Sequence, residues 1–199
     1  EPGKEPAPPK DAPADNSKLF AGGPVPLWIW GPDANKQYLL RTTFAAAGVN
    51  KAVLRVTADN RVKLSVNGKQ VAASDEWKDA AEADVTKLLK PEGNEVVAAV
   101  TNEGGGAGLV FKLALVPEMG EPTYVVSDEK WTADAMANAA PEKVKKVATY
   151  GDAPWGKVLE ASADLGGKSK VAAGTFQVPP GFQVEKLFTV PKNDLGSWV

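Results

Sequence analysis

Short stretches of alternating apolar and polar residues recur along the middle of the chain, and each predicts a β-strand. Residues 52–58, 61–66, 94–102 and 109–115 all show this period of two, which places successive apolar side chains on one strand face. Further short runs rich in β-branched and aromatic residues predict strands at residues 28–30, 38–46, 124–127 and 143–150. No long stretch shows the period of a helix.

Turn signals separate these segments. Asn67-Gly68 lies between the strand at 61–66 and a return strand that begins at Val71. The pair predicts a type I′ hairpin, because that turn requires positive φ at both positions. Residues 83–90 predict a short helical turn that Asp84 caps. Many short strands, with turn signals every 8 to 12 residues or so and little helix, are typical of an all-β two-sheet sandwich or jelly roll.

Composition sets the predicted domain limits. Residues 1–18 are rich in Pro, Ala, Lys and Asp, and they predict a disordered tail or linker because they offer too little apolar surface to offset chain entropy. The sandwich is predicted over 19–158 and a linker over 159–175. The linker's Gly166-Gly167-Lys168-Ser169 is similar to the end of a Walker A loop, but Ser162 stands where that motif requires its first glycine.

The residue types present exclude several kinds of catalytic and metal-binding site. The chain contains no Cys and no His, which removes Cys nucleophiles, Ser-His-Asp triads, His or Cys zinc sites and covalent c-type haem attachment within these residues. The formal net charge of −2 argues against a nucleic-acid or anionic-membrane binder. The chain has no apolar run of about 18 residues, so the sequence predicts no membrane insertion. We expect a chain that is not an enzyme, with a hydrolytic carboxylate pair as a minor alternative.

A glycine-rich loop, residues 103–108, raises the question of phosphate binding. Phosphate-binding glycine motifs open a helix, whose N-terminal amides hold the anion. Here the loop precedes the predicted strand that starts at Leu109. We therefore interpret it as a plain hairpin loop.

The tryptophans supply the candidate ligand contacts. Trp28 and Trp30 have strand spacing and are predicted to share a face, with at least one in the core, and Trp131 and Trp155 follow short strands, where aromatic residues often seal a sandwich. Trp77 instead lies in a polar connection beside Asp75 and Glu76. An aromatic face with nearby carboxylate, amide or arginine groups is typical of sugar binding, although structural packing of Trp77 stays open.

The full set of candidate carbohydrate-binding residues is Trp77, Asp75, Glu76, Arg41, Asn102 and Trp155. Asp33 and Asp59 are candidate oxygen ligands for a structural calcium ion. Turn chemistry explains these two aspartates equally well. No other cofactor is expected in this chain.

A series of short motifs resembles a known family. It runs through Trp28-Ile29-Trp30-Gly31, Leu40-Arg41-Thr42-Thr43-Phe44, Val66-Asn67-Gly68-Lys69, Trp77, Asp84-Val85-Thr86, Gly93-Asn94-Glu95-Val96-Val97, Asp128, Trp131 and Pro154-Trp155-Gly156. In order and spacing it resembles the N-terminal β-sandwich of bacterial rhamnosidase-like proteins and their galactose-binding-like relatives, over residues 27–156. The resemblance implies a galactose-binding-like jelly roll but transfers no binding site.

The last two dozen residues carry a second resemblance. Phe176-Gln177-Val178-Pro179-Pro180-Gly181-Phe182 and Gly196-Ser197-Trp198-Val199 resemble the opening of a β-propeller in membrane-bound dehydrogenase-like bacterial proteins that often carry a c-type haem domain. The resemblance implies that residues 176–199 begin a following domain of a longer protein. Any haem chemistry would belong to that further region.

These observations predict a non-catalytic carbohydrate-binding module of a larger, secreted bacterial protein, periplasmic or extracellular. Its expected partners are a polysaccharide or oligosaccharide and the downstream domains of the same protein. The alternative is a structural or protein-contact sandwich that supports the adjacent propeller and haem domains and has no glycan site. The position of the Trp77 side chain, open on a loop or packed in the sandwich, separates the two.

Overall fold

The computed structural model describes residues 16–135 and 140–160 of the 199-residue chain. Residues 1–15 of the tail predicted over 1–18, the Walker-like segment and the propeller-like segment at 176–199 lie outside the described residues. Ser17 and Lys18, at the end of the range predicted as a tail, belong to a short helix, α1 (Ser17–Ala21).

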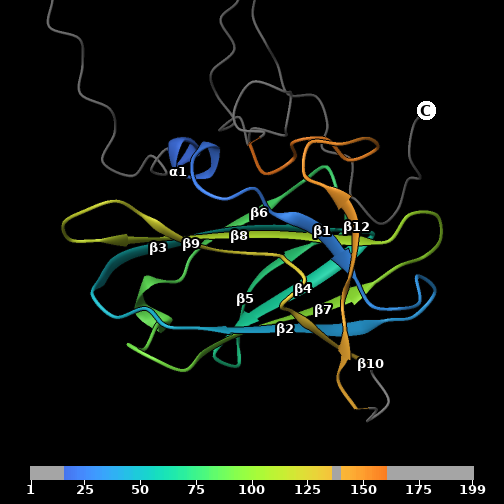
Figure 1. Cartoon of the computed structure of the whole chain (residues 1–199), viewed down its shortest axis with the longest axis horizontal. Coiled ribbons are helices and arrows are strands. Elements are labelled where there is room, and N and C mark those ends of the chain that lie inside the picture. The colour runs from blue at the N-terminus through green and yellow to red at the C-terminus, as the bar shows by residue number, and fades with distance from the viewer. Residues whose placement is uncertain (1–15, 136–139, 161–199) are drawn as a thin grey trace, which may run out of the picture. The chain divides into compact units, whose positions relative to one another are not determined.

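The strands form two sheets that pack face to face, with antiparallel pairing throughout the described residues (Figure 1). The first sheet has the order β12-β1-β8-β3-β6, with β9 also paired to β8. Its strands are β1 (Leu27–Trp30), β3 (Val49–Asp59), β6 (Ala81–Asp84), β8 (Gly108–Pro117), β9 (Thr123–Val126) and β12 (Lys145–Thr149). The predicted all-β sandwich is confirmed.

The second sheet has the order β11-β10-β2-β7-β4-β5. Its strands are β2 (Tyr38–Phe44), β4 (Arg61–Val66), β5 (Lys69–Ser74), β7 (Asn94–Thr101), β10 (Thr132–Ala135) and β11 (Glu142–Lys143). Successive strands often change sheet: in chain order, β3 of the first sheet lies between β2 and β4 of the second, and β6 lies between β5 and β7, as expected of a jelly roll.

The alternating apolar positions of the two sheets meet and form the main core. From the first sheet, Leu54, Phe111 and Leu113 are fully buried there, and Leu40 and Leu64 oppose them from the second. Burial of each such side chain contributes roughly 1.5–3 kcal/mol. This apolar layer therefore holds the two sheets together.

The predicted hairpin at Asn67-Gly68 is confirmed. β4 and β5 pair on either side of it, and the two turn residues have φ values of 51° and 80°, as a type I′ turn requires. The predicted helical turn is confirmed in a shorter form, a 3-10 turn over Thr86–Leu88, and the Asp84 carboxylate accepts a hydrogen bond from the Thr86 amide at 2.9 Å.

The glycine-rich loop is not a hairpin loop, and that prediction is wrong. It joins β7 of the second sheet to β8 of the first, so the strands on either side of it do not pair with each other. Its glycines allow close approach of aromatic rings: a Cβ atom on Gly108 would lie 2.8 Å from the Trp28 ring. The loop does open a strand rather than a helix, as expected.

The outer face of the first sheet is covered by α1 and by the segment 150–160, drawn in blue and orange (Figure 1). Beneath them lie two cationic side chains that oppose each other on neighbouring strands, Arg55 of β3 and Lys112 of β8. Both are buried, and burial lowers the pKa of Lys112, against the opposing charge of Glu160. The Lys112 ammonium group donates to the backbone carbonyls of Phe20 and Gly22.

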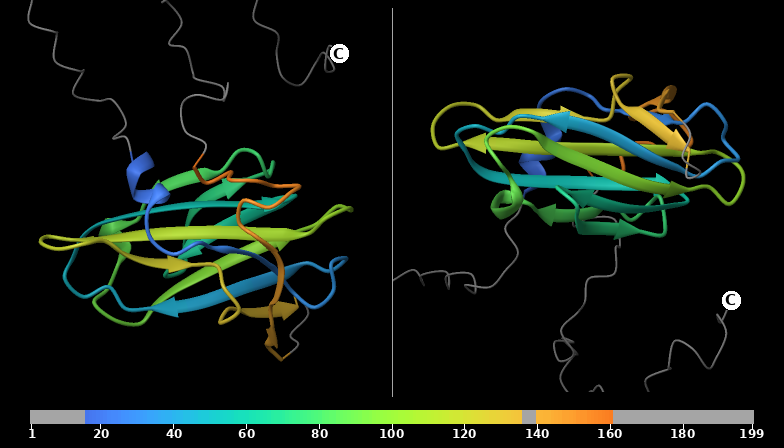
Figure 2. Two further views of the ribbon diagram at one scale, coloured as in Figure 1. Left: turned by 45° about the horizontal axis from the view of Figure 1, so that its top comes forward. Right: turned by 90° about the horizontal axis from the view of Figure 1, so that it is seen from below.

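The connections gather at two opposite ends of the sandwich (Figure 2). At one end lie the β1–β2, β3–β4, β5–β6 and β7–β8 connections, because β3 finishes where β8 begins. At the other lie the β2–β3, β4–β5, β6–β7 and β8–β9 connections. We call these the Trp77 end and the hairpin end, after the residue and the turn they carry.

Candidate functional site

The β5–β6 connection, residues 75–80, presents the best candidate residue from the sequence on a firmly held loop. Ser74, at its start, is buried, and its hydroxyl lies 2.8 Å from the Glu76 carbonyl oxygen and 2.9 Å from that of Asp79. The hydroxyl of Thr57, fully buried on β3, donates to the same Glu76 carbonyl at 3.2 Å. These buried hydroxyls fix the backbone on both sides of Trp77.

The indole of Trp77 is half-buried, whereas Trp28, Trp30, Trp131 and Trp155 are buried. It packs against a second apolar cluster on the outer side of the first sheet, formed by Trp28, Val110, Trp155, Val158 and Leu159. The ammonium nitrogen of Lys78 lies 5.1 Å from the centre of the Trp77 ring. Trp77 is thus neither a core residue nor fully open: it offers a partly exposed aromatic surface that a lysine covers in part.

The carboxylates beside Trp77 are exposed. Asp75 and Glu76 both lie at the surface, and one Glu76 carboxylate oxygen is 3.5 Å from the Lys78 amide nitrogen. These carboxylates offer hydrogen-bond acceptors next to the apolar surface of the indole. That combination suits a sugar, which presents hydroxyl donors around an apolar ring face.

Trp155 has a structural position rather than an open one. It is 5% exposed, its ring stacks on that of Trp28, and its indole N–H donates to the Asp59 carboxylate at 2.9 Å. The ring of Trp155 also comes close to Gly106 of the glycine-rich loop, where an added Cβ would lie 3.0 Å away. Trp155 therefore seals the Trp77 end, as predicted for an aromatic residue after a short strand.

Trp28 and Trp30 pack in different clusters. Trp30 lies in the main core, where its ring makes an edge contact with Tyr38 at 6.3 Å, and Trp28 lies in the second cluster. The prediction that at least one of the pair is a core residue is confirmed. The prediction that the two share a face is wrong, because the register of β1 on β12 shifts between Trp28 and Ile29. The outer face of the first sheet is covered, and the apolar residues there form a second buried cluster. The alternation of residues along a strand does not predict such a cover.

Arg41 and Asn102, the remaining sugar-binding candidates, are engaged elsewhere. Arg41 of β2 forms ion pairs with Asp134 at 2.6 Å and Glu95 at 3.1 Å, and its hydrogen bond to Asp134 raises its pKa. The Asn102 amide group donates to the Ala34 carbonyl at 3.0 Å and so ties the β7–β8 connection to the β1–β2 connection. Neither contact joins these residues to Trp77.

The calcium candidates have ordinary turn partners. One Asp33 carboxylate oxygen accepts from the Asn35 amide at 2.9 Å, and Asp59 accepts from Trp155. Within residues 16–135 and 140–160, no three or more carboxylates gather as they would around a metal ion. Calcium at these aspartates stays a prediction.

Sequence reasoning missed a groove at the hairpin end. It has a volume of about 820 Å³ and is lined by Asn50, Lys51, Lys69, Gln70, Val71, Asp84, Thr86, Lys87 and Leu88. These residues come from β3, β5, β6 and the 3-10 turn, and because they are widely separated in the chain, no local motif reveals the site.

Among the described helices, none has the length and apolar character needed to cross a membrane.

Comparison with known proteins finds a similar β-sandwich in a rhamnosidase and in a lectin. No family model matches the chain. An α-L-rhamnosidase from Streptomyces avermitilis is 27% identical over 162 residues, which is 68% of this chain and 16% of the rhamnosidase. The crystal structure of this enzyme with L-rhamnose superposes with a TM-score of 0.62 at 25% identity, over 68% of this chain and 16% of that one.

A lectin from Pleurotus ostreatus is also similar. In its ligand-free form it gives a TM-score of 0.60 at 25% identity, over 67% of this chain and 44% of the lectin. The same lectin with GalNAc gives 0.60 at 24% identity, over 71% of this chain and 46% of the lectin, and supports the fold. The chain thus spans less than half of each of these proteins and shares the β-sandwich found in a lectin and in rhamnosidases.

Proposed function

We propose that this chain is a non-catalytic carbohydrate-binding module that holds a neighbouring domain of a larger, secreted bacterial protein close to a polysaccharide. The observation that carries the proposal is Trp77, a half-buried indole with a partly exposed face, on a loop that Thr57 and Ser74 anchor in a sandwich similar to that of a lectin. Sugars pack on such aromatic surfaces through their apolar ring faces.

The anchored loop favours binding because little is lost when a ligand arrives. A ligand that orders a flexible loop must offset its conformational entropy, about 0.5–1.5 kcal/mol for each mobile side chain. The buried hydroxyl contacts to Glu76 and Asp79 hold the loop backbone before any ligand binds. Lys78, which lies over the Trp77 ring, would have to move aside.

A glycan panel tests the proposal. The 199-residue chain would be titrated with neutral plant and algal oligosaccharides, and calorimetry would measure the heat of binding. We expect Trp77→Ala to weaken the binding of a ligand at least about tenfold, because one stacked ring contributes about 1 kcal/mol or more beyond area burial. Lys78→Ala, which uncovers the indole, should keep or raise affinity.

The matched control is Met119→Ala. Met119 is an apolar side chain 89% exposed on the β8–β9 connection, at the opposite end of the sandwich. Its removal should leave glycan affinity unchanged. Absence of binding to any glycan at millimolar concentration, or an equal loss in both variants, would contradict the proposal.

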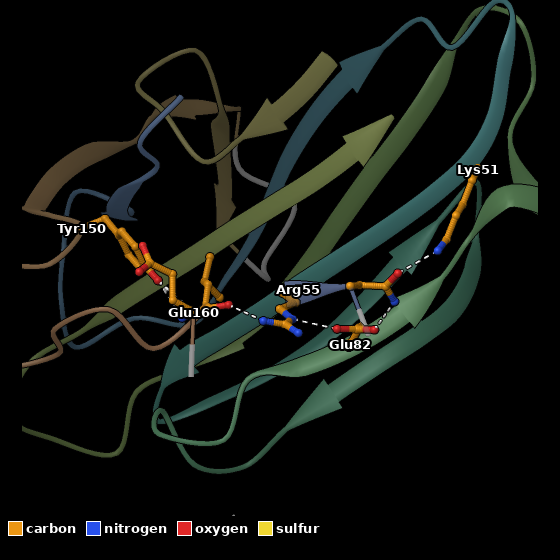
Figure 3. A network of polar contacts seen from close by, with 7 residues as sticks. Lys51, Arg55, Glu82, Tyr150 and Glu160 are labelled. Atoms are coloured by element: carbon orange, nitrogen blue, oxygen red, sulfur yellow. Dashed lines mark hydrogen bonds and ion pairs between the residues drawn. The ribbon is translucent and has the colours of Figure 1, made fainter. Parts of the chain in front are cut away.

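A second candidate function is a structural domain that fixes the chain segments at its two ends. A chain of polar contacts supports it: Asn16 donates to Glu82 at 2.7 Å, Glu82 pairs with Arg55 at 2.7 Å, and Arg55 donates to the Leu159 carbonyl at 2.7 Å (Figure 3). It therefore bridges the first and the last described segments. Glycan binding that depends on Trp77 would favour the first function over this one.

A further inference from the structure

The groove at the hairpin end is lined by cations whose charges are not neutralised. Lys51, Lys69 and Lys87 line it, against the single carboxylate of Asp84. Lys51 donates to the neutral amide oxygen of Asn16 at 2.7 Å. Among residues 16–135 and 140–160, the side-chain ammonium groups of Lys69 and Lys87 have no hydrogen-bond or ion-pair partner, whereas Arg41, Arg55 and Arg61 are each paired with a carboxylate.

The other groups of the groove suit a sugar rather than a bare anion. Val71 and Leu88 are half-buried, pack against the main core and give the groove an apolar part. The amides of Asn50 and Gln70 add donors and acceptors. A volume of about 820 Å³ lies within the range of roughly 300–1,000 Å³ that is usual for small-molecule sites.

The groove also lies between two free strand edges. In the described chain, β5 pairs with β4 alone and β6 pairs with β3 alone, so each is an edge of its sheet. An edge strand leaves backbone amide and carbonyl groups without strand partners. These groups add a row of hydrogen-bonding sites beside the lysines, at positions that hydroxyl groups of a sugar can reach.

We propose that this groove binds an acidic saccharide, one whose sugar rings carry carboxylate or sulfate groups. The anionic groups would pair with Lys69 and Lys87, and the hydroxyls would meet the amides of Asn50 and Gln70. The inference rests on the proposed function in taking the ligand to be a glycan, but it assigns a different site from Trp77. In the groove, charge selects the ligand, whereas at Trp77 an apolar ring surface selects it.

The test compares ligands of one size and different charge on the same protein. The probes are a galacturonic-acid trisaccharide, a sulfated galactose trisaccharide and an uncharged galactose trisaccharide. We expect the acidic trisaccharides to bind at least about tenfold more tightly than the neutral one at low salt, and to lose this preference at high salt because ions screen exposed charges. Preference for the carboxylated or for the sulfated probe identifies which acidic group the groove takes.

Variants localise the binding. Lys69→Ala/Lys87→Ala should lower the affinity for the acidic probe about tenfold, since an exposed ion pair contributes up to about a factor of five. The control is Lys36→Ala/Lys63→Ala, which removes the same charge from exposed lysines away from the groove. The control should keep the acidic preference, and both proteins should unfold at the temperature of the parent.

Four results would overturn the inference. They are no preference for acidic probes, an equal loss in both double variants, binding of inorganic sulfate as tight as that of the sulfated trisaccharide, and equal binding of a triglutamate peptide. Failure of the groove inference can be distinguished from failure of the proposed function. Trp77→Ala removes neutral-glycan binding alone, and the groove variant removes the acidic preference alone.

Discussion

The indole of Trp155 stacks on that of Trp28, with ring centroids 4.5 Å apart and 24° between the ring planes. This contact fixes the segment 150–160 to the outer face of the first sheet, where Val110, Val158 and Leu159 complete the cluster. The segment contains only short turns, so its position depends on these side chains and on the indole hydrogen bond to Asp59.

Trp155→Ala is expected to destabilise the domain by about 3–5 kcal/mol, the usual cost of removing a buried large aromatic side chain. Urea unfolding followed by circular dichroism measures the loss. Trp155→Phe, which keeps a ring on Trp28 but loses the bond to Asp59, should cost clearly less. A Trp155→Ala protein as stable as the parent would show that the segment 150–160 does not contribute to the fold.

Arg55 connects the segments at both ends of the described chain, and its loss should release both. Its guanidinium group pairs with Glu82 and donates to the Leu159 carbonyl, and it lies 4.4 Å from the centre of the Phe20 ring in α1. Arg55→Met keeps an unbranched stem as far as the position of the arginine Nε atom but leaves the Glu82 charge without this partner. We expect a loss of about 2–3 kcal/mol, below the full cost of a deeply buried pair because Glu82 is partly exposed.

The double variant Arg55→Met/Glu82→Gln distinguishes the charge from the packing. It removes the unpaired carboxylate, and the glutamine oxygen can still accept from Asn16. Part of the lost stability should therefore return. Amide exchange in α1 and at Leu159 should accelerate in Arg55→Met, and unchanged exchange at both places would refute the bridging role.

Tyr150 makes part of the stability dependent on alkaline pH. Its hydroxyl oxygen accepts from the amides of Leu159 and Glu160 at 2.9 and 3.0 Å. Burial, with the nearby charge of Glu160, raises the pKa of Tyr150 from 10 to about 12. The folded state therefore holds this proton more tightly than the unfolded state, and the stability that Tyr150 contributes is complete below pH 10 and is lost as the pH rises through 12.

Tyr150→Phe should flatten that part of the stability profile. Unfolding free energies measured as the pH rises from 10 towards 12 should fall less with pH in the variant than in the parent, because this interval separates the ordinary pKa of tyrosine from the raised pKa of Tyr150. Ultraviolet titration of the phenolate group gives an independent reading. A Tyr150 that ionises at the ordinary pKa of tyrosine would contradict the buried position of its hydroxyl.

The local parts of the fold are predictable from sequence, and the parts that join distant segments are not. Asn67-Gly68 shows its turn directly, because positive φ at two adjacent positions restricts the residue types. The glycine-rich loop shows flexibility but not which sheet the next strand joins, and so its prediction as a hairpin failed. Register and sheet order depend on contacts far apart in the chain.

The candidate sites follow the same division. Trp77 was found because its polar neighbours mark a connection, and the structure places it half-buried on that connection. The burial of Arg55 and Lys112 was not foreseen, since α1 and the segment 150–160 that cover them have no strand pattern. The groove lysines lie on different elements, and only the folded chain brings them together.

Asn94 organises the hairpin end, and its removal provides the last prediction. It is fully buried, and its amide oxygen accepts from the Lys90 amide at 2.8 Å and from the Asn67 side chain at 2.9 Å. Its amide group donates to the Lys90 carbonyl at 2.7 Å. The Asn67 side chain in turn donates to the Leu88 carbonyl at 2.8 Å, which ties the hairpin turn to one wall of the groove.

Asn94→Ala leaves several of these polar groups buried without a partner, and each such group costs about 1–3 kcal/mol. We expect a loss of about 3 kcal/mol in urea unfolding, together with faster amide exchange at Lys90 and Leu88. Asn102→Ala is the matched control, because its amide makes a contact with the Ala34 carbonyl at a half-exposed site and its loss should cost about 1 kcal/mol or less. Equal losses in the two variants would show that the Asn94 network adds nothing beyond an ordinary surface contact. If the network does hold the groove wall, Asn94→Ala should also weaken binding of the acidic trisaccharide while Trp77-dependent binding of the neutral glycan persists.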